Sequence, residues 1–157
     1  MVLQPRLTAV CGDAYKSLHD PVKIIRPRLW TQPMKELKER LEAKSGVRFT
    51  HVLFNLYRNG NDSISWHHYN ERACGDYPLI TSVSLGAART FQFRNYDNKK
   101  IRLAVELTPG SVLIMKGRTQ HCWEQQVPKT KRESVHASIL LSGLVNEGIR
   151  PGRVFLN

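Results

Sequence analysis

The sequence predicts a mainly β fold of the α+β class: an antiparallel double sheet, sandwich or jelly roll with one amphipathic helix packed on a sheet. Three observations support this. One helical pattern lies early in the chain, about eight short segments rich in β-branched or aromatic residues follow it, and turn signals separate those segments. The 157 residues are enough for one compact domain with a core, and too few for two of ordinary size.

The first regular element expected is a helix from about residue 32 to residue 44. Thr31 is typical of an N-cap, apolar residues recur at helical spacing as far as Leu41, and Gly46 supplies the stop. Before the helix, residues 1–30 mix prolines with basic and apolar residues. That composition predicts an irregular segment with short extended pieces.

After the helix, the spacing of apolar residues along the sequence changes from that of a helix to that of strands. Turn signals such as Asp-Asn at 97–98 and Pro-Gly at 109–110 divide this part of the chain. Residues 1–145 therefore form one predicted domain, and residues 146–157 are predicted to be a tail. The predicted strands cover residues 50–58, 63–68, 79–85, 90–94, 101–107, 111–115, 119–127 and 135–145.

The net charge is the most informative feature of the composition. Twenty-four Lys and Arg against 13 Asp and Glu leave a net charge of +11. Such an excess favours a polyanionic partner, although a basic domain without one is the alternative. No apolar run reaches the length of a membrane span, so no membrane insertion is expected. Three cysteines without a Cys-x-x-Cys pair argue against a disulfide framework and favour a reducing compartment inside the cell.

Several blocks of residues carry a more specific signal because they occur in a fixed order. They resemble AlkB-type Fe(II)/2-oxoglutarate dioxygenases, most of all the animal members that act on single-stranded DNA and RNA. The resemblance covers about residues 4–145 and implies a double-stranded β-helix, a jelly roll that agrees with the strand pattern. The blocks are Gln-Pro-Arg-Leu-Thr-Ala at 4–9, Asn-Leu-Tyr-Arg at 55–58, Asp-Ser-Ile-Ser-Trp-His at 62–67, Pro-Leu-Ile at 78–80, Ser-Leu-Gly-Ala-Ala-Arg-Thr-Phe at 84–91, Gly-Ser-Val-Leu-Ile-Met at 110–115, Thr-Gln at 119–120, Trp123 and Val-Pro-Lys at 127–129.

The resemblance implies an iron site made of a His-x-Asp pair and a distal histidine, which leaves open positions for cosubstrate and oxygen. His67 stands at the first of these positions. Tyr69 stands where the aspartate is expected, and Gln125 stands where the distal histidine is expected. Since two of the three ligands are absent, the metal site is expected to be vestigial.

The resemblance also implies a 2-oxoglutarate site built from an Asn-x-Tyr pair and two arginines of the last core strand. Asn55 and Tyr57 match the pair, but Val135 and Leu141 stand at the arginine positions, and a one-residue shift of register restores neither arginine. A dicarboxylate buried without a guanidinium partner has a severe desolvation cost. We therefore expect no cofactor, and we expect Leu141 to fill the pocket.

The remaining histidines could form a metal centre only if its ligands moved from the expected positions to His68, His121 and His136. This set lacks a carboxylate, and His68 and Asn70 point to the opposite face of their strand from His67. We therefore interpret the three histidines as surface or hydrogen-bonded residues.

The remaining polar and aromatic residues are given structural roles. Asp62 and Glu71 are expected to be solvated loop residues. Four aromatic residues are expected to fill the barrel: Trp66, Phe91, Phe93 and Trp123.

These observations favour a catalytically inactive AlkB-like module. One form of this hypothesis is an RNA- or DNA-binding protein, and another is a protein subunit of a larger ribonucleoprotein or mitochondrial complex. The alternative is an active nucleic-acid demethylase that uses Fe(II) and 2-oxoglutarate, and a third option is a cavity that binds another small ligand. The residues expected to contact nucleic acid or a partner are Arg58, Lys99, Lys100, Lys129, Lys131 and Arg132.

Overall fold

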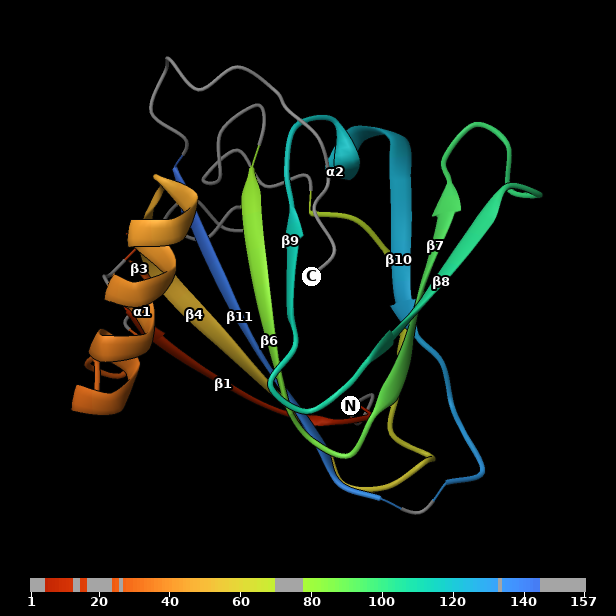
Figure 1. The fold of residues 1–157 in the computed structure, drawn as a ribbon, viewed down its shortest axis with the longest axis horizontal. Coiled ribbons are helices and arrows are strands. Elements are labelled where there is room, and N and C mark those ends of the chain that lie inside the picture. The colour runs from red at the N-terminus through yellow and green to blue at the C-terminus, as the bar shows by residue number, and fades with distance from the viewer. Residues whose placement is uncertain are drawn as a thin grey trace.

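Two antiparallel sheets and one long helix form a three-layer structure (Figure 1). This computed structural model describes residues 5–12, 15–16, 24–25, 27–69, 78–132 and 134–144. The elements are β1 (Leu7–Gly12), β2 (Tyr15–Lys16), β3 (Ile24–Ile25), α1 (Gln32–Ser45), β4 (Arg48–Tyr57), β5 (Ile64–His67), β6 (Leu79–Gly86), β7 (Arg89–Asn95), β8 (Arg102–Leu107), β9 (Val112–Met115), α2 (Thr119–Cys122), β10 (Trp123–Val127) and β11 (His136–Leu144).

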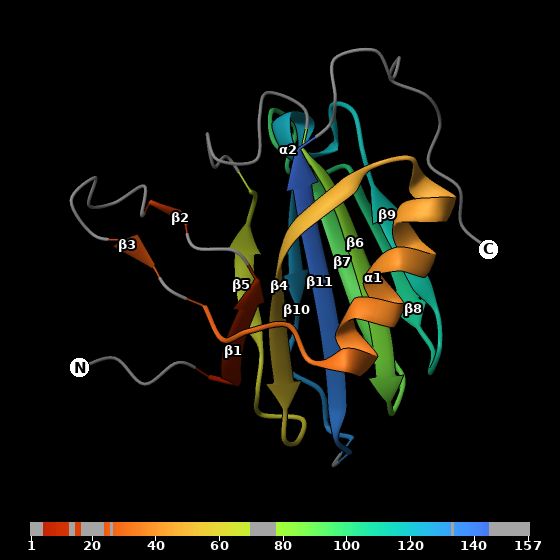
Figure 2. The same cartoon turned by 90° about the vertical axis from the view of Figure 1, so that its left-hand side faces the viewer.

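The larger sheet has five strands in the order β1-β4-β11-β6-β9, and the smaller has four in the order β5-β10-β7-β8. Figure 2 shows α1 lying along the outer side of the larger sheet. The two remaining strands, β2 and β3, form a separate antiparallel pair among the residues that the structure describes. Neither helix in the described ranges is long and apolar enough to cross a membrane. The predicted mainly β jelly-roll fold with one amphipathic helix on a sheet is therefore confirmed.

The predicted helix is confirmed to within one residue at its end. Thr31 holds the N-cap position with an extended backbone but makes no side-chain cap hydrogen bond, and Pro33 pre-sets the first turn. Gly46 ends the helix in the left-handed region at φ 70°, where its N–H donates to the Glu42 carbonyl at 2.9 Å. Leu41 is the buried residue through which α1 meets the sheet.

Two elements differ from the predicted pattern. The predicted strand over 119–127 begins with a helical turn, α2, because the carbonyl of Arg118 accepts the N–H groups of His121 and Cys122. Within the first thirty residues, β1 pairs with β4 as an edge strand of the larger sheet. The predicted tail at 146–157 lies outside the described residues.

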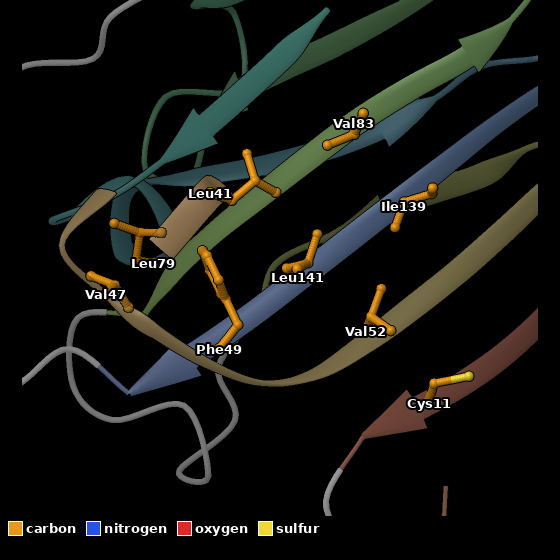
Figure 3. Close-up of a cluster of buried hydrophobic side chains, with 9 residues drawn as sticks. All are labelled: Cys11, Leu41, Val47, Phe49, Val52, Leu79, Val83, Ile139 and Leu141. Carbon is orange, nitrogen blue, oxygen red and sulfur yellow. The ribbon is translucent and has the colours of Figure 1, made fainter. Parts of the chain in front are cut away.

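Apolar side chains form one cluster on each side of the larger sheet. The first cluster lies between α1 and the sheet, and Figure 3 shows Leu41 of α1 among side chains of β6 and β11. The second fills the space between the two sheets, with Phe91 and Phe93 of β7 in contact at 5.0 Å between ring centroids. Since side chains alternate along a strand, β11 contributes Ile139 to the first cluster and Leu140 to the second.

A buried arginine joins the loops at one end of the sandwich. Arg89 of β7 is only 2% exposed. Its Nη1 donates to the Asn59 carbonyl at 3.1 Å, and its Nη2 donates to the carbonyls of Asp62 at 2.9 Å and Pro128 at 2.8 Å. The guanidinium carbon also lies 5.4 Å from the centroid of the Tyr57 ring. One side chain therefore holds the β4–β5 loop against the segment that follows β10.

The same loops meet a second time at Gly60. A Cβ atom on Gly60 would lie 2.0 Å from the Thr130 carbonyl oxygen, so only glycine fits there. The two backbones also pair directly, because the Thr130 N–H donates to the Gly60 carbonyl at 2.9 Å.

Asp62 was expected to be a solvated loop residue, and this interpretation is wrong. Asp62 is 5% exposed, and its carboxylate accepts hydrogen bonds from the Arg58 backbone N–H at 2.9 Å, Nε at 2.8 Å and Nη2 at 2.9 Å. These hydrogen bonds compensate the charge and lower the pKa of Asp62 to about 2. The expected role of Glu71 lies outside the described residues.

Replacing Arg89 should be among the most destabilising single changes in the chain. Arg89→Ala leaves three carbonyls without their charged donor, and we expect the free energy of unfolding to fall by about 3–5 kcal/mol. Urea unfolding at neutral pH measures this loss. Arg132→Ala, which removes an exposed ion pair with Glu106, is the matched control and should cost less than about 1 kcal/mol. Equal losses for the two variants would contradict the role given to Arg89.

Asp62 should make stability depend on pH under acid conditions. Its pKa is lower in the folded chain than its ordinary value of 3.8, so the unfolded chain takes up the proton first. The contribution of Asp62 is therefore complete above about pH 5 and is lost as the pH falls toward 2. We expect Asp62→Asn to be less stable than the wild type at pH 7 and to lose less stability between pH 5 and 2. Urea unfolding at several pH values tests this, and an equally steep decline in both proteins would contradict it.

Candidate functional site

One pocket between the two sheets collects the residues that the sequence associates with iron and 2-oxoglutarate. Asn55 and Tyr57 reach it from β4, His67 from β5 and Gln125 from β10, and Tyr69 lies just beyond the end of β5. The remaining lining residues are Ile64, Ser82, Phe91, Leu107, Val127, His136, Ser138 and Leu140. Residues up to 85 positions apart in the chain, from Asn55 to Leu140, therefore meet in one place.

Strand β11 presents a different set of side chains to this pocket than expected. His136 pairs with Tyr57 and Ser138 with Asn55, so the even-numbered residues face the pocket. Val135 precedes the strand and is 55% exposed. Leu141 faces α1 in the first apolar cluster, as Figure 3 shows. The expectation that Leu141 fills the pocket is therefore wrong, and its neighbour Leu140 occupies that space.

The three side chains at the expected iron-ligand positions contact one another or their neighbours. The Nδ1–H of His67 donates to the Ser65 carbonyl at 2.8 Å, and the Tyr69 ring meets the His67 ring edge-on at 5.4 Å. The carboxamides of Gln125 and Gln120 approach to 3.4 Å, and Gln120 also accepts the Tyr69 N–H at 3.0 Å. Burial lowers the pKa of His67, against the opposing effect of its backbone hydrogen bonds.

His136 is the most polar side chain that β11 places in the pocket. Its Nδ1–H donates to the Ala87 carbonyl at 2.7 Å, which leaves Nε2 as an acceptor. Nε2 is buried and has no hydrogen-bond partner in the described part of the chain. Burial lowers the pKa of His136 and raises the pKa of Tyr57 to about 12. Tyr57, His67 and His136 are therefore neutral at pH 7.

Two arginines lie close to the pocket without lining it, and the sequence analysis missed both. Arg6 donates from Nε to Asn55 Oδ1 at 2.7 Å, and its charge acts on Tyr57 and His67. The guanidinium of Arg89 already donates hydrogen bonds to three backbone carbonyls of the neighbouring loops. Both arginines belong to blocks that carry the family resemblance. The resemblance, however, places the guanidinium partners of 2-oxoglutarate on the last core strand.

The residues present do not fit 2-oxoglutarate. The cavity measures about 20 Å³, enough for a single water molecule and far too small for a dicarboxylate. No lining side chain carries a positive charge. Since the Arg89 guanidinium is already engaged, it is not available to balance two buried carboxylates.

The residues present do not fit a facial iron triad either. The three expected positions supply an imidazole, a phenol and a carboxamide, with no carboxylate among the pocket residues. Within the described ranges, no group of three His, Cys, Asp or Glu side chains is placed to hold a metal ion. The shifted set does not converge: His136 lines the pocket, His121 is exposed, and His68 contacts the ring of Tyr96. Asn70 lies outside the described residues.

The six basic residues expected to contact a partner do not form one patch. Lys99 and Lys100 lie in the β7–β8 turn, whereas Lys129, Lys131 and Arg132 lie between β10 and β11. Figure 1 shows these two connections at opposite ends of the smaller sheet. Arg58 follows β4, at the same end of the sandwich as the β10–β11 connection, and forms an ion pair with Asp62.

Trp66 was expected to fill the barrel, but it lies on the outer face of the smaller sheet. The guanidinium carbon of Arg94 sits 4.4 Å from the centroid of the Trp66 ring. Arg94 alternates with the buried residue Phe93, so it points away from the space between the sheets. The other three aromatic residues named with Trp66 behave as expected, since Phe91 and Phe93 are buried and Trp123 packs on the same cluster.

Comparison with known proteins shows which family this chain resembles in sequence and in fold. The family model described as the 2OG-Fe(II) oxygenase superfamily matches residues 5–157. Human alpha-ketoglutarate-dependent dioxygenase alkB homolog 3 is 39% identical over 134 residues, which cover 80% of this chain and 46% of that protein. Human DNA oxidative demethylase ALKBH2 is 32% identical over 135 residues, which cover 82% of this chain and 52% of that protein.

The chain thus spans about half the length of the curated relatives it matches. Among solved structures, that of OsALKBH1 superposes with a TM-score of 0.62 at 14% identity, over 88% of this chain and 81% of that chain, which supports the fold alone. The sequence match and the fold agree, and the chain belongs to the AlkB-like family of the 2OG-Fe(II) oxygenase superfamily.

Proposed function

We propose that this chain is an AlkB-like module that does not carry out the dioxygenase reaction and that binds nucleic acid through its basic surface. The observation that carries the proposal is the pocket. Its Tyr57, His67 and His136 side chains are neutral, its volume is about 20 Å³, and its lining lacks the carboxylate and the guanidinium groups that iron and 2-oxoglutarate need.

The chemistry of the three expected ligand positions supports the absence of iron catalysis. A divalent iron site needs a carboxylate to offset part of the metal charge, and Tyr69 offers a phenol in its place. Gln125 offers a carboxamide that already interacts with Gln120. His67 alone among the three is a good metal ligand, and one imidazole does not hold iron against water.

Nucleic-acid binding is supported by the net charge and by the family. The net charge of +11 gives long-range attraction for a polyanion, and phosphate contacts need only lysine and arginine side chains. The relatives named above include a DNA oxidative demethylase. A module that keeps their fold and its own basic surface retains a means of holding nucleic acid without any reaction in the pocket.

Metal uptake distinguishes this proposal from an active demethylase. We expect the wild-type chain to bind well below one Mn(II) ion per molecule and to release no succinate from 2-oxoglutarate. The double variant Tyr69→Asp with Gln125→His restores the ligand types at two positions that line the pocket with His67. It should therefore gain Mn(II) affinity, which isothermal titration calorimetry measures.

His67→Ala in the double variant is the matched control and should abolish the gained affinity. One metal ion bound per wild-type chain, together with succinate release, would overturn the proposal and establish the enzyme instead. A double variant that binds no more Mn(II) than the wild type would show that these three positions do not form a ligand set.

Salt dependence tests the binding half of the proposal. We expect the affinity of the wild-type chain for a fluorescent oligonucleotide to fall linearly on a log–log plot against salt, with a slope of about −0.7 for each phosphate contacted on a single strand. Fluorescence anisotropy between 50 and 200 mM salt, a range in which several contacts change the affinity measurably, provides the slope. No binding at low salt would contradict the proposal and favour a subunit that needs its assembly partners.

A further inference from the structure

A second cavity lies at one edge of the sandwich, away from the pocket described above. Strand β9 forms one edge of the larger sheet, and β8 forms one edge of the smaller sheet. The two strands are joined by the turn at residues 108–111, and Figure 1 shows them diverging from this turn toward the end of the molecule where α2 lies. Side chains from β7, β8, β9, α2 and β10 enclose the space between them, which we call the edge cavity.

The edge cavity is apolar and measures about 210 Å³. Its walls include Phe93, Leu113 and Trp123, and all but one of its described lining residues are hydrophobic. The exception is Thr119, whose hydroxyl already donates to the Lys116 carbonyl at 2.7 Å. A water molecule inside a protein needs several polar partners, and these walls offer few. The lining is therefore better suited to a hydrocarbon than to water.

The cavity opens to solvent along β8. Alternate side chains of this strand point between the sheets, and those near the turn are covered, since Leu107 is 2% exposed. At the other end of the strand Leu103, which lines the cavity, is 55% exposed, and Ile101 just before the strand is 50% exposed. A ligand that removes such side chains from water gains binding free energy. The mouth therefore favours a ligand with an apolar part.

The volume of the edge cavity limits the size of that apolar part. An apolar cavity of about 150 Å³ in another protein binds benzene, which corresponds to about 25 Å³ for each carbon atom. At the same ratio, a cavity of about 210 Å³ holds about eight carbon atoms. Because one side is open, the ligand can bury a hydrocarbon chain and keep a polar end in water. These features describe an amphiphile with a chain of medium length.

The charge at the rim of the cavity is positive. The connection between β9 and α2 runs along the rim, since the residues on either side of it line the cavity, and it carries Lys116 and Arg118. Arg118 is exposed and forms no ion pair with a carboxylate in the described ranges. Glu106 and Glu124, which are next to lining residues in the chain, form ion pairs with other cations. The polar end of the ligand is therefore expected to be an anion.

We infer that the edge cavity binds a fatty acid of medium chain length, with its hydrocarbon chain between β8 and β9 and its carboxylate at the rim beside Arg118. The hydrophobic walls bury the chain, and the cations of the rim attract the carboxylate. An empty apolar cavity lowers the stability of a fold in proportion to its volume, so the bound chain should also raise the melting temperature. This site is separate from the pocket and does not rest on the proposed function.

A series of saturated fatty acids tests the size of the site. Each added methylene should tighten binding by about fourfold while it still enters the cavity. The gain should stop near a chain of about eight carbons, because further methylenes remain in water. Isothermal titration calorimetry from hexanoate to dodecanoate, below the concentrations at which micelles form, measures the affinities. A series without this break, or a wild-type chain that binds no member of it, would overturn the inference.

Leu103→Trp tests the location. It enlarges a side chain at the mouth without changing a buried residue, and it should weaken octanoate binding by about tenfold or more, because about two methylenes can no longer enter. Leu85→Trp is the matched control, since Leu85 is a leucine of similar exposure on the larger sheet, and it should bind octanoate as the wild type does. Thermal unfolding without ligand confirms that both variants are folded. Wild-type affinity in Leu103→Trp would place the ligand elsewhere and overturn the inference.

Arg118→Ala tests the position of the carboxylate. It should weaken binding of octanoate by about two- to fivefold and leave the binding of octanol unchanged, because only octanoate carries a charge at the rim. Arg132→Ala removes an exposed arginine that pairs with Glu106, and it should change neither affinity. Equal losses for octanoate and octanol in Arg118→Ala would overturn the assignment of the carboxylate to the rim. A wild-type dimer that binds no octanoate and that Leu103→Trp dissociates would show that the mouth is an interface between copies of the chain instead.

Discussion

The sandwich depends on the buried guanidinium of Arg89. Two of the chain's crossings between the larger and the smaller sheet lie between β4 and β5 and between β10 and β11. Arg89 donates to carbonyls in both crossings while its own strand lies in the smaller sheet. Burial lowers the pKa of Arg89, but its donors are matched by carbonyls, which compensates much of the cost of removing the charge from water. Gly60 permits the close approach of the two crossings that this arrangement requires.

Most polar groups of the pocket form hydrogen bonds with one another or with neighbouring residues. Asn55 accepts from Arg6, Ser138 hydrogen-bonds with the Tyr57 phenol, and the Gln125 amide lies against the Gln120 amide. Buried polar groups destabilise a fold only when they lack partners. His136 Nε2 is the exception among these residues, and a cavity with room for one water molecule lies beside it.

Much of the fold could be predicted from the sequence, because the helical and strand periods are local signals. The helix, its glycine stop and the positions along the chain of most strands after it follow from spacing and turn residues. Which side chains of β11 face the pocket could not be predicted in this way. A shift of the strand by one residue exchanges the positions of Leu140 and Leu141, and both positions lie in apolar clusters that the sequence pattern does not distinguish. The role of Arg89 was missed for another reason, since its partners are backbone carbonyls that carry no sequence signal.

The alternation of side chains along a strand also explains how the pocket and the surface can change independently. Gln125 faces the pocket, while its neighbour Glu124 faces outward and binds Arg94 and Lys99. His67 and Trp66 divide in the same way on β5. A substitution that removes a ligand from the inner face leaves the outer face with the same backbone and the same neighbours. Under the proposed function, the inner faces of these strands have lost their original chemistry. The outer faces keep an ordered set of aromatic rings and cations, because the buried clusters and the loop contacts of Arg89, rather than a bound metal, set the positions of the strands.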